Sequence, residues 1–95
     1  MNLNFETENW PVPTPLRSHI EQLLASIEEF GVPNTTEAKI EIYVSGDHLY
    51  NVTITLKWAS FEVSANNSHY NPYLAVTTAC DQLKSRTQSL IETHQ

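Results

Sequence analysis

Hydrophobic and polar residues alternate in four stretches of the chain, which is the pattern of a strand with one covered face. The stretches predicted as strands are residues 2–6, 38–44, 50–57 and 60–65. Turn-forming residues at 45–48 join the second stretch to the third, and a tight connection near Trp58-Ala59 joins the third to the fourth. The last three strands are therefore predicted to form a meander, with the short first strand at an edge.

A different period, with apolar residues every three or four positions, predicts a helix at residues 15–30. Thr14 has the side chain of a helix cap, and the fixed φ of Pro15 suits the first helical position. Gly31 tolerates the positive φ of a helix C-terminus, and Pro33 prevents continuation.

A second helix is predicted from Asn71-Pro72 to about residue 92, after a polar loop at residues 66–69. Asn71 supplies the cap and Pro72 the first turn. The residues expected on its buried stripe are Tyr73, Val76, Cys80, Leu83 and Leu90, with Thr77 and Thr87 as small members.

Each predicted strand has one apolar face, so both helices must cover the same side of one sheet. The fold class is therefore α+β, with the order β-α-β-β-β-α and two helices packed on one face of a four-stranded sheet. With 95 residues and no linker or repeat, residues 1–95 are predicted to form a single domain. The opposite sheet face is left to solvent or to a partner.

The composition of the chain excludes several classes of protein. A share of 40% apolar and 17% charged residues is typical of a globular chain. The single cysteine cannot form an internal disulfide, and no signal-peptide pattern opens the sequence, so we expect a cytoplasmic protein. No apolar run is long enough to span a bilayer, and a net charge of −6 opposes binding to polyanions, so neither a membrane nor DNA is an expected partner.

Candidate chemistry is sparse. The four histidines have no metal-ligand spacing, and Asp47-His48 reads as a solvated turn more readily than as an acid-base pair. Cys80 lies on the apolar stripe, as a buried thiol does. We therefore expect no enzyme activity, metal or cofactor. Most aromatic rings fall in phase with the core, and only Tyr43 is clearly on the open sheet face.

Four short sequence segments are informative together with this element order. They are Leu16-Arg17, Thr53-Ile54-Thr55-Leu56, Val63-Ser64-Ala65 and Tyr73-Leu74-Ala75-Val76. With that order, they resemble the ribosome hibernation-promoting factor family, also called sigma-54 modulation or ribosome-associated inhibitor proteins. The resemblance runs from Asn2 to about Leu90. It implies a fold like that of double-stranded-RNA-binding domains and a cytoplasmic bacterial protein that binds the small ribosomal subunit and silences translation in stationary phase or stress.

The resemblance also implies which residues contact ribosomal RNA, because family members use lysine and arginine, mainly on the helices. Arg17, Lys84 and Arg86 fall at such positions, and Lys39 and Lys57 complete the candidate set. Where the family is rich in lysine on its last helix, this chain has Gln82, Ser85, Gln88, Ser89 and Glu92. The family's glycine-rich turn between the third and fourth strands is replaced by Trp58-Ala59, and the loop before the last helix looks lengthened.

Alternative functions stay open at this point. The acidic charge and polar sheet face also fit a regulatory protein-binding module on the same scaffold. Double-stranded RNA binding would need a basic start to the last helix, where the sequence has Tyr70-Asn71-Pro72-Tyr73. An enzyme acting on a small molecule would need converging catalytic groups, which the sequence does not offer.

Overall fold

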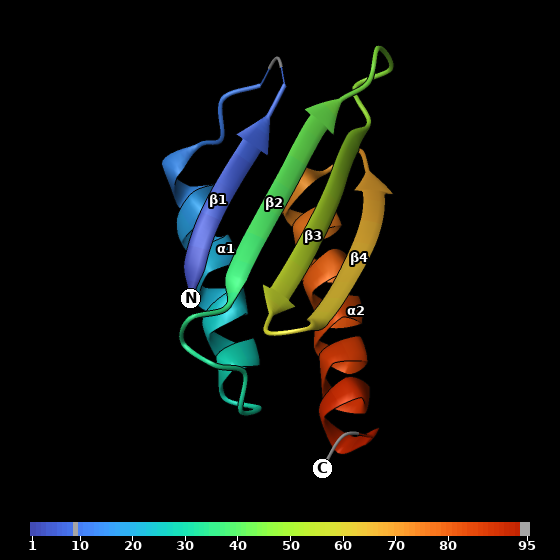
Figure 1. The fold of residues 1–95 in the computed structure, drawn as a ribbon. Helices are drawn as coiled ribbons and strands as arrows, with labels where there is room; N and C mark the ends of the chain where they lie inside the picture. The colour runs from blue at the N-terminus through green and yellow to red at the C-terminus, as the bar shows by residue number, and fades with distance from the viewer. Residues whose placement is uncertain (9, 94–95) are drawn as a thin grey trace.

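The structure is a computed structural model that describes residues 1–8 and 10–93, and it has a sheet layer and a helix layer. The elements, in chain order, are β1 (Asn2–Thr7), α1 (Thr14–Glu28), β2 (Glu37–Val44), β3 (Tyr50–Trp58), β4 (Phe61–His69) and α2 (Pro72–Thr93). The sheet order is β1-β2-β3-β4, with β1 parallel to β2 and the other pairs antiparallel. Both helices lie on one face of the sheet (Figure 1), so the predicted α+β fold is confirmed.

The core lies between the sheet and the two helices. The alternation seen in the sequence places one apolar face of the strands inward, and the central strands β2 and β3 bury it fully except at their ends near Val44, Tyr50 and Trp58. The fully covered strand residues include Ile40, Ile42, Val52, Ile54 and Leu56, and the helices meet them with Leu16, Ile20, Leu24, Ile27, Val76 and Leu83. Burial of these side chains is the main source of stability, since it removes apolar surface from water.

The start of α1 differs from the prediction by one position. Pro13, with ψ of 144°, occupies the cap position, and Thr14 is already helical, so its side chain makes no cap hydrogen bond. The Arg17 N–H donates to the Pro13 carbonyl at 3.0 Å and closes the first turn. The helix also ends at Glu28, two residues before the predicted end, and Gly31 has the expected positive φ, of 99°.

The prediction of a polar loop at residues 66–69 was wrong, because these residues extend β4. The register pairs Thr53 with Asn66 and continues to Tyr50 and His69. The Asn66 Nδ2 donates to Thr53 Oγ1 at 2.7 Å, and the Ser68 hydroxyl donates to Asn51 Oδ1 at 2.6 Å. These cross-strand bonds and the ladder outweigh the turn preference of the asparagines. The connection to α2 is correspondingly shorter than predicted.

The cap of α2 is as predicted, since Asn71 Oδ1 accepts the Tyr73 N–H at 2.9 Å. Val76, Cys80, Leu83 and Thr87 are buried, but Tyr73 was wrongly placed in the core and is 41% exposed. Thr77 and Leu90 are only half-buried. The inward positions that were missed are Ala75 and Ala79, whose small side chains let the helix approach its neighbours closely.

The tight connection between β3 and β4 contains a strained residue that a substitution can test. Ala59 has a φ of 48°, in the left-handed region that glycine adopts without steric penalty. We expect Ala59→Gly to raise the free energy of unfolding by roughly 1 kcal/mol, because it relieves this strain. The same change at exposed Ala25 in α1 is expected to lower it by about 1 kcal/mol, since glycine weakens a helix interior. If urea unfolding shows that both substitutions change the free energy of unfolding in the same direction, Ala59 is not strained in the way described.

Candidate functional site

Arg17, the first candidate contact residue, lies on α1 over β1. Its guanidinium carbon is 4.2 Å from the centre of the Phe5 ring, a cation-π distance, and the side chain is exposed. The half-buried Phe5 ring therefore supports the guanidinium in one orientation while its donors remain available to a partner.

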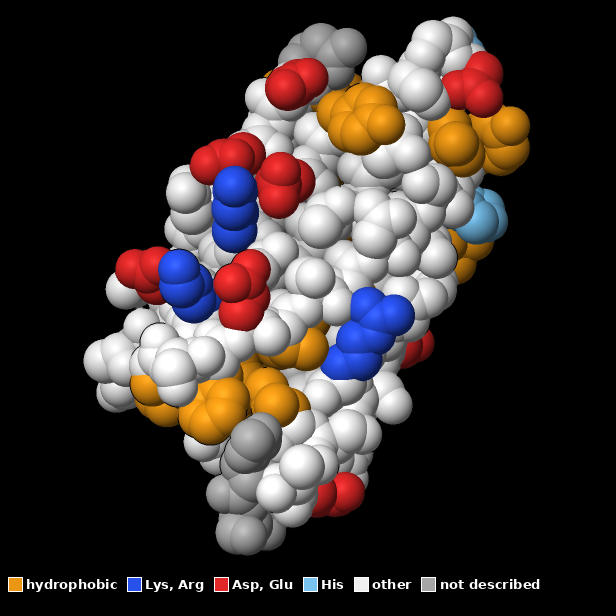
Figure 2. All heavy atoms as spheres, turned by 45° about the vertical axis from the view of Figure 1, so that its right-hand side comes forward, with side chains coloured by type: hydrophobic (Ala, Val, Ile, Leu, Met, Phe, Trp, Pro, Cys, Tyr) orange, Lys and Arg blue, Asp and Glu red, His pale blue; other side chains and the backbone are white. Residues whose placement is uncertain are grey.

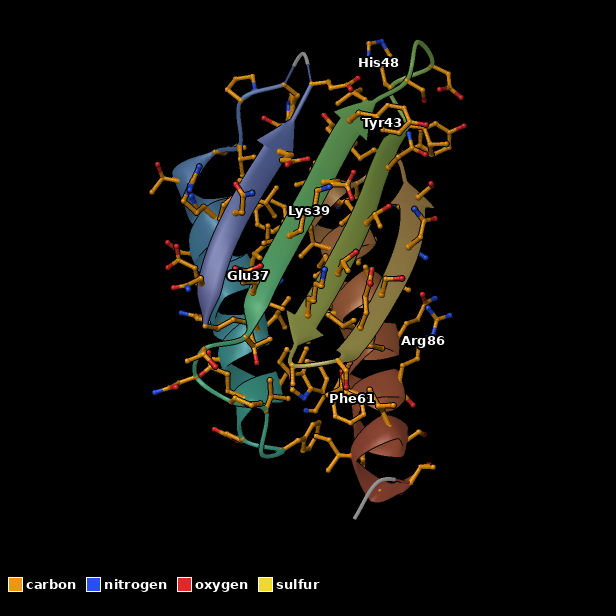
Figure 3. The ribbon with its side chains drawn as sticks, viewed as in Figure 1. Glu37, Lys39, Tyr43, His48, Phe61 and Arg86 are labelled. Carbon is orange, nitrogen blue, oxygen red and sulfur yellow. The ribbon has the colours of Figure 1, made fainter. Side chains whose placement is uncertain are left out.

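Lys84 and Arg86 lie on different sides of α2, as expected for residues about 200° apart around a helix. The Lys84 Nζ is 5.4 Å from the centre of the Phe30 ring, next to the end of α1. The Arg86 Nη1 donates to the Ser64 carbonyl of β4 at 2.6 Å, and Figure 3 shows Arg86 beside that strand. The two charges thus point toward opposite flanks of the helix layer.

The three helix cations do not converge on one basic patch. Arg17 lies over β1, Lys84 between the C-terminal parts of the helices, and Arg86 at the β4 edge. Within residues 1–8 and 10–93, however, the ion pairs involve only Lys39 and the amino group of Met1, which lies 3.2 Å from Glu28. The helix cations therefore keep charges that no carboxylate directly neutralises.

The open face of the sheet carries the other two candidate cations among carboxylates. Lys39 Nζ is 3.4 Å from Glu6 and 4.0 Å from Glu41. The strand register places Lys57 between Glu37 of β2 and Glu62 of β4. Figure 2 shows these blue and red side chains interleaved on the sheet side. With more carboxylates than cations, this face is acidic.

A hollow of about 390 Å³ lies at the C-terminal ends of β1 and β2. Its walls include Phe5, Glu6, Glu8, Glu41 and Tyr43. Tyr43 is 51% exposed, as predicted for the open face, and Figure 3 shows it near the end of β2. The hollow is too open and too acidic for an anionic ligand, but it offers carboxylates and the exposed ring of Tyr43 to a cationic ligand.

The other aromatic rings are only partly in the core. Trp10 packs edge-on against Tyr50, with ring centres 5.0 Å apart, and Trp58 lies 5.8 Å from Phe61. Tyr70 is 66% exposed. It lies on the short link between β4 and α2, where the extension of β4 leaves no covering element.

The structure offers little catalytic chemistry. Among the described residues, no group of three or more His, Cys, Asp and Glu side chains could hold a metal ion. Asp47 is fully exposed in the β2–β3 turn and accepts the Ser45 hydroxyl at 2.5 Å, a bond that lowers the pKa of the Asp47 carboxyl. His19 Nε2 lies 3.0 Å from Thr77 Oγ1, which links the two helices. These contacts are structural.

Burial raises the pKa of the Cys80 thiol from its ordinary value of 9.0 to about 12. The folded protein then holds the thiol proton at pH values where the unfolded chain releases it, so stability falls as pH rises between about 9 and 12. At pH 8 we expect a disulfide reagent to modify Cys80 only after unfolding in denaturant. Rapid modification of the native protein would contradict this burial.

No helix in the described part of the chain is long and apolar enough to cross a membrane.

Among curated protein sequences, none matches the chain. Several solved structures share the fold, and two of them illustrate the similarity. The N-terminal domain of Protein Y from Thermus thermophilus has a TM-score of 0.83 at 19% identity, with 95% of this chain and 99% of that chain covered. A ribosomal subunit interface protein from Coxiella burnetii has a TM-score of 0.82 at 15% identity, with 97% and 99% covered.

The family model described as "Sigma 54 modulation protein / S30EA ribosomal protein" matches residues 3–93, nearly all of the six elements. This match agrees with the family resemblance of the short sequence segments and with the order of strands and helices in the fold. The chain belongs to the sigma-54 modulation protein / S30EA ribosomal protein family.

Proposed function

We propose that this protein binds the small ribosomal subunit and inhibits translation under stress or in stationary phase. The observation that carries the proposal is the family match over residues 3–93, and the shared fold supports it. The protein would act in the cytoplasm as a binding protein, without enzyme activity or a cofactor. Ribosomal RNA would be its main contact.

The RNA contact is assigned first to Arg17, Lys84 and Arg86. All three are exposed and free of direct ion pairs within the described residues, so their charges remain available to phosphates. Lys39 and Lys57 are secondary candidates, because neighbouring carboxylates offset their attraction for RNA.

The small number of cations makes a quantitative prediction about salt. Binding to RNA releases counterions in proportion to the phosphates neutralised, and this chain has only five Lys and Arg residues. In cosedimentation with purified small subunits, we expect a slope of log affinity against log salt no steeper than about −4. Absence from the ribosomal fraction even at about 50 mM salt would overturn the proposal.

A second candidate function is that of an acidic regulatory module that binds another protein. The observation favouring it is the open sheet face, where the cations lie among carboxylates and the net charge is negative. A stable protein partner recovered equally well after nuclease treatment would support this function. Recovery of ribosomal components alone would exclude it.

A further inference from the structure

The two edges of the sheet expose backbone groups that have no strand beside them. β1 and β4 are the edge strands. On β1, the Asn2 N–H donates to the Thr36 carbonyl at 2.9 Å, on the β2 side. Backbone groups alternate in direction along a strand, so the N–H and C=O groups of Leu3, Phe5 and Thr7 point away from β2.

The edge of β4 is protected, whereas that of β1 is not. Arg86 covers the β4 edge by donating to the Ser64 carbonyl at 2.6 Å. Within residues 1–8 and 10–93, no side chain makes a hydrogen bond to the outward groups of Leu3, Phe5 or Thr7. β1 contains neither lysine nor proline, two residues that commonly prevent edge pairing.

The surroundings of the β1 edge define the chemistry of a partner. The hollow beside its C-terminal end is lined by Glu6, Glu8 and Glu41 together with the exposed ring of Tyr43. Lys39 is the cation paired with two of these carboxylates, which leaves the cluster negative. A cationic side chain near this edge would meet both carboxylates and a ring face.

We infer that the free edge of β1 docks an extended, lysine- or arginine-rich segment of another protein, which adds a fifth strand to the sheet. Backbone hydrogen bonds to Leu3, Phe5 and Thr7 supply the binding, and alternate cations of the segment reach Glu6, Glu8 and Glu41. A second copy of this chain fits the edge poorly, because two copies with a net charge of −6 repel each other. This inference goes beyond ribosome binding and does not depend on it.

The test uses the full chain and a short synthetic peptide, blocked at both ends, in which lysine alternates with threonine or valine. Binding is followed by NMR, and we expect slowed amide exchange at Leu3, Phe5 and Thr7. Thr7→Pro removes an outward N–H without removing a bond to β2, so we expect about a fivefold loss of affinity, the size typical of one backbone hydrogen bond. Ser68→Pro is the control at the β4 edge. It removes an outward N–H and also the hydroxyl bond to Asn51 Oδ1, so its folding is verified by circular dichroism before binding is compared.

Several results would overturn the inference. One is that the Thr7→Pro and Ser68→Pro variants bind the peptide with equal affinity. Another is that the peptide slows amide exchange only in strands other than β1. The third is that a peptide with glutamate in place of lysine binds as tightly as the lysine peptide. A concentration-dependent dimer that protects the same β1 amides without peptide would assign the edge to a second copy instead. If Thr7→Pro does not fold, the exchange pattern of the unmodified protein decides by itself.

Discussion

Replacing Arg17, Lys84 and Arg86 together by glutamate is expected to lower the affinity for small ribosomal subunits by at least about a hundredfold at low salt. These residues carry three of the five Lys and Arg charges, and each substitution changes the net charge by two units, from −6 to −12 in total. The variant would lose its phosphate contacts and add repulsion. Sedimentation binding at several salt concentrations measures the effect.

The matched control reverses Lys39 and Lys57 on the open sheet face. Both lie among carboxylates, so we expect a loss several times smaller than that of the helix variant. The sheet variant changes the net charge by four units and the helix variant by six. A loss in the sheet variant that is about two-thirds as large on a logarithmic scale would therefore mean that overall charge, and not the helix surface, governs binding. A loss only in the sheet variant would assign the contact to the opposite face.

The largest expected effect on stability comes from Ile54→Ala. Ile54 is 0% exposed on the central strand β3, which packs against α2, and truncation would remove buried methyl groups and leave a cavity in the core. We expect the free energy of unfolding to fall by about 3 kcal/mol, a large fraction of the total for a domain of this size. Urea unfolding followed by circular dichroism measures this change.

Thr55→Ala is the control, since Thr55 is the next residue of β3 and its side chain lies on the open face. We expect a loss below about 1 kcal/mol, because little apolar surface is uncovered. Similar losses at the two positions would mean that the helices do not cover the face assigned to them. Binding to ribosomes should survive in whatever fraction of Ile54→Ala remains folded.

Much of the fold could be predicted because its signals are local. The alternation around Ile54 and the Asn71 cap were sufficient to place β3 and the start of α2. The prediction failed where contacts distant in sequence decide, as at Asn66, whose turn preference is overridden by Thr53 on the neighbouring strand. Tyr73 was misplaced because the buried stripe of α2 begins at Ala75 and Val76, and alanine gives a weak apolar signal in the sequence.

The candidate site was less predictable than the fold. The spacing of Lys84 and Arg86 indicated that they diverge on α2, but nothing in the sequence shows that Arg86 binds the edge of β4. The ion pair of Lys39 with Glu6 depends on the parallel pairing of β1 and β2, which periodicity does not specify. Which charges remain free is therefore a property of the tertiary structure.

Competition on the small subunit tests the central claim most directly. The family resemblance implies docking in the small-subunit channel where messenger and transfer RNA lie, and a protein bound there would compete with them. Purified small subunits would be titrated with this protein, with and without a bound messenger and initiator transfer RNA. We expect the protein and the bound RNAs to exclude each other. The apparent affinity of the protein should therefore fall as the fraction of small subunits carrying messenger and transfer RNA rises. Undiminished binding to programmed subunits, or binding to large subunits alone, would contradict the account.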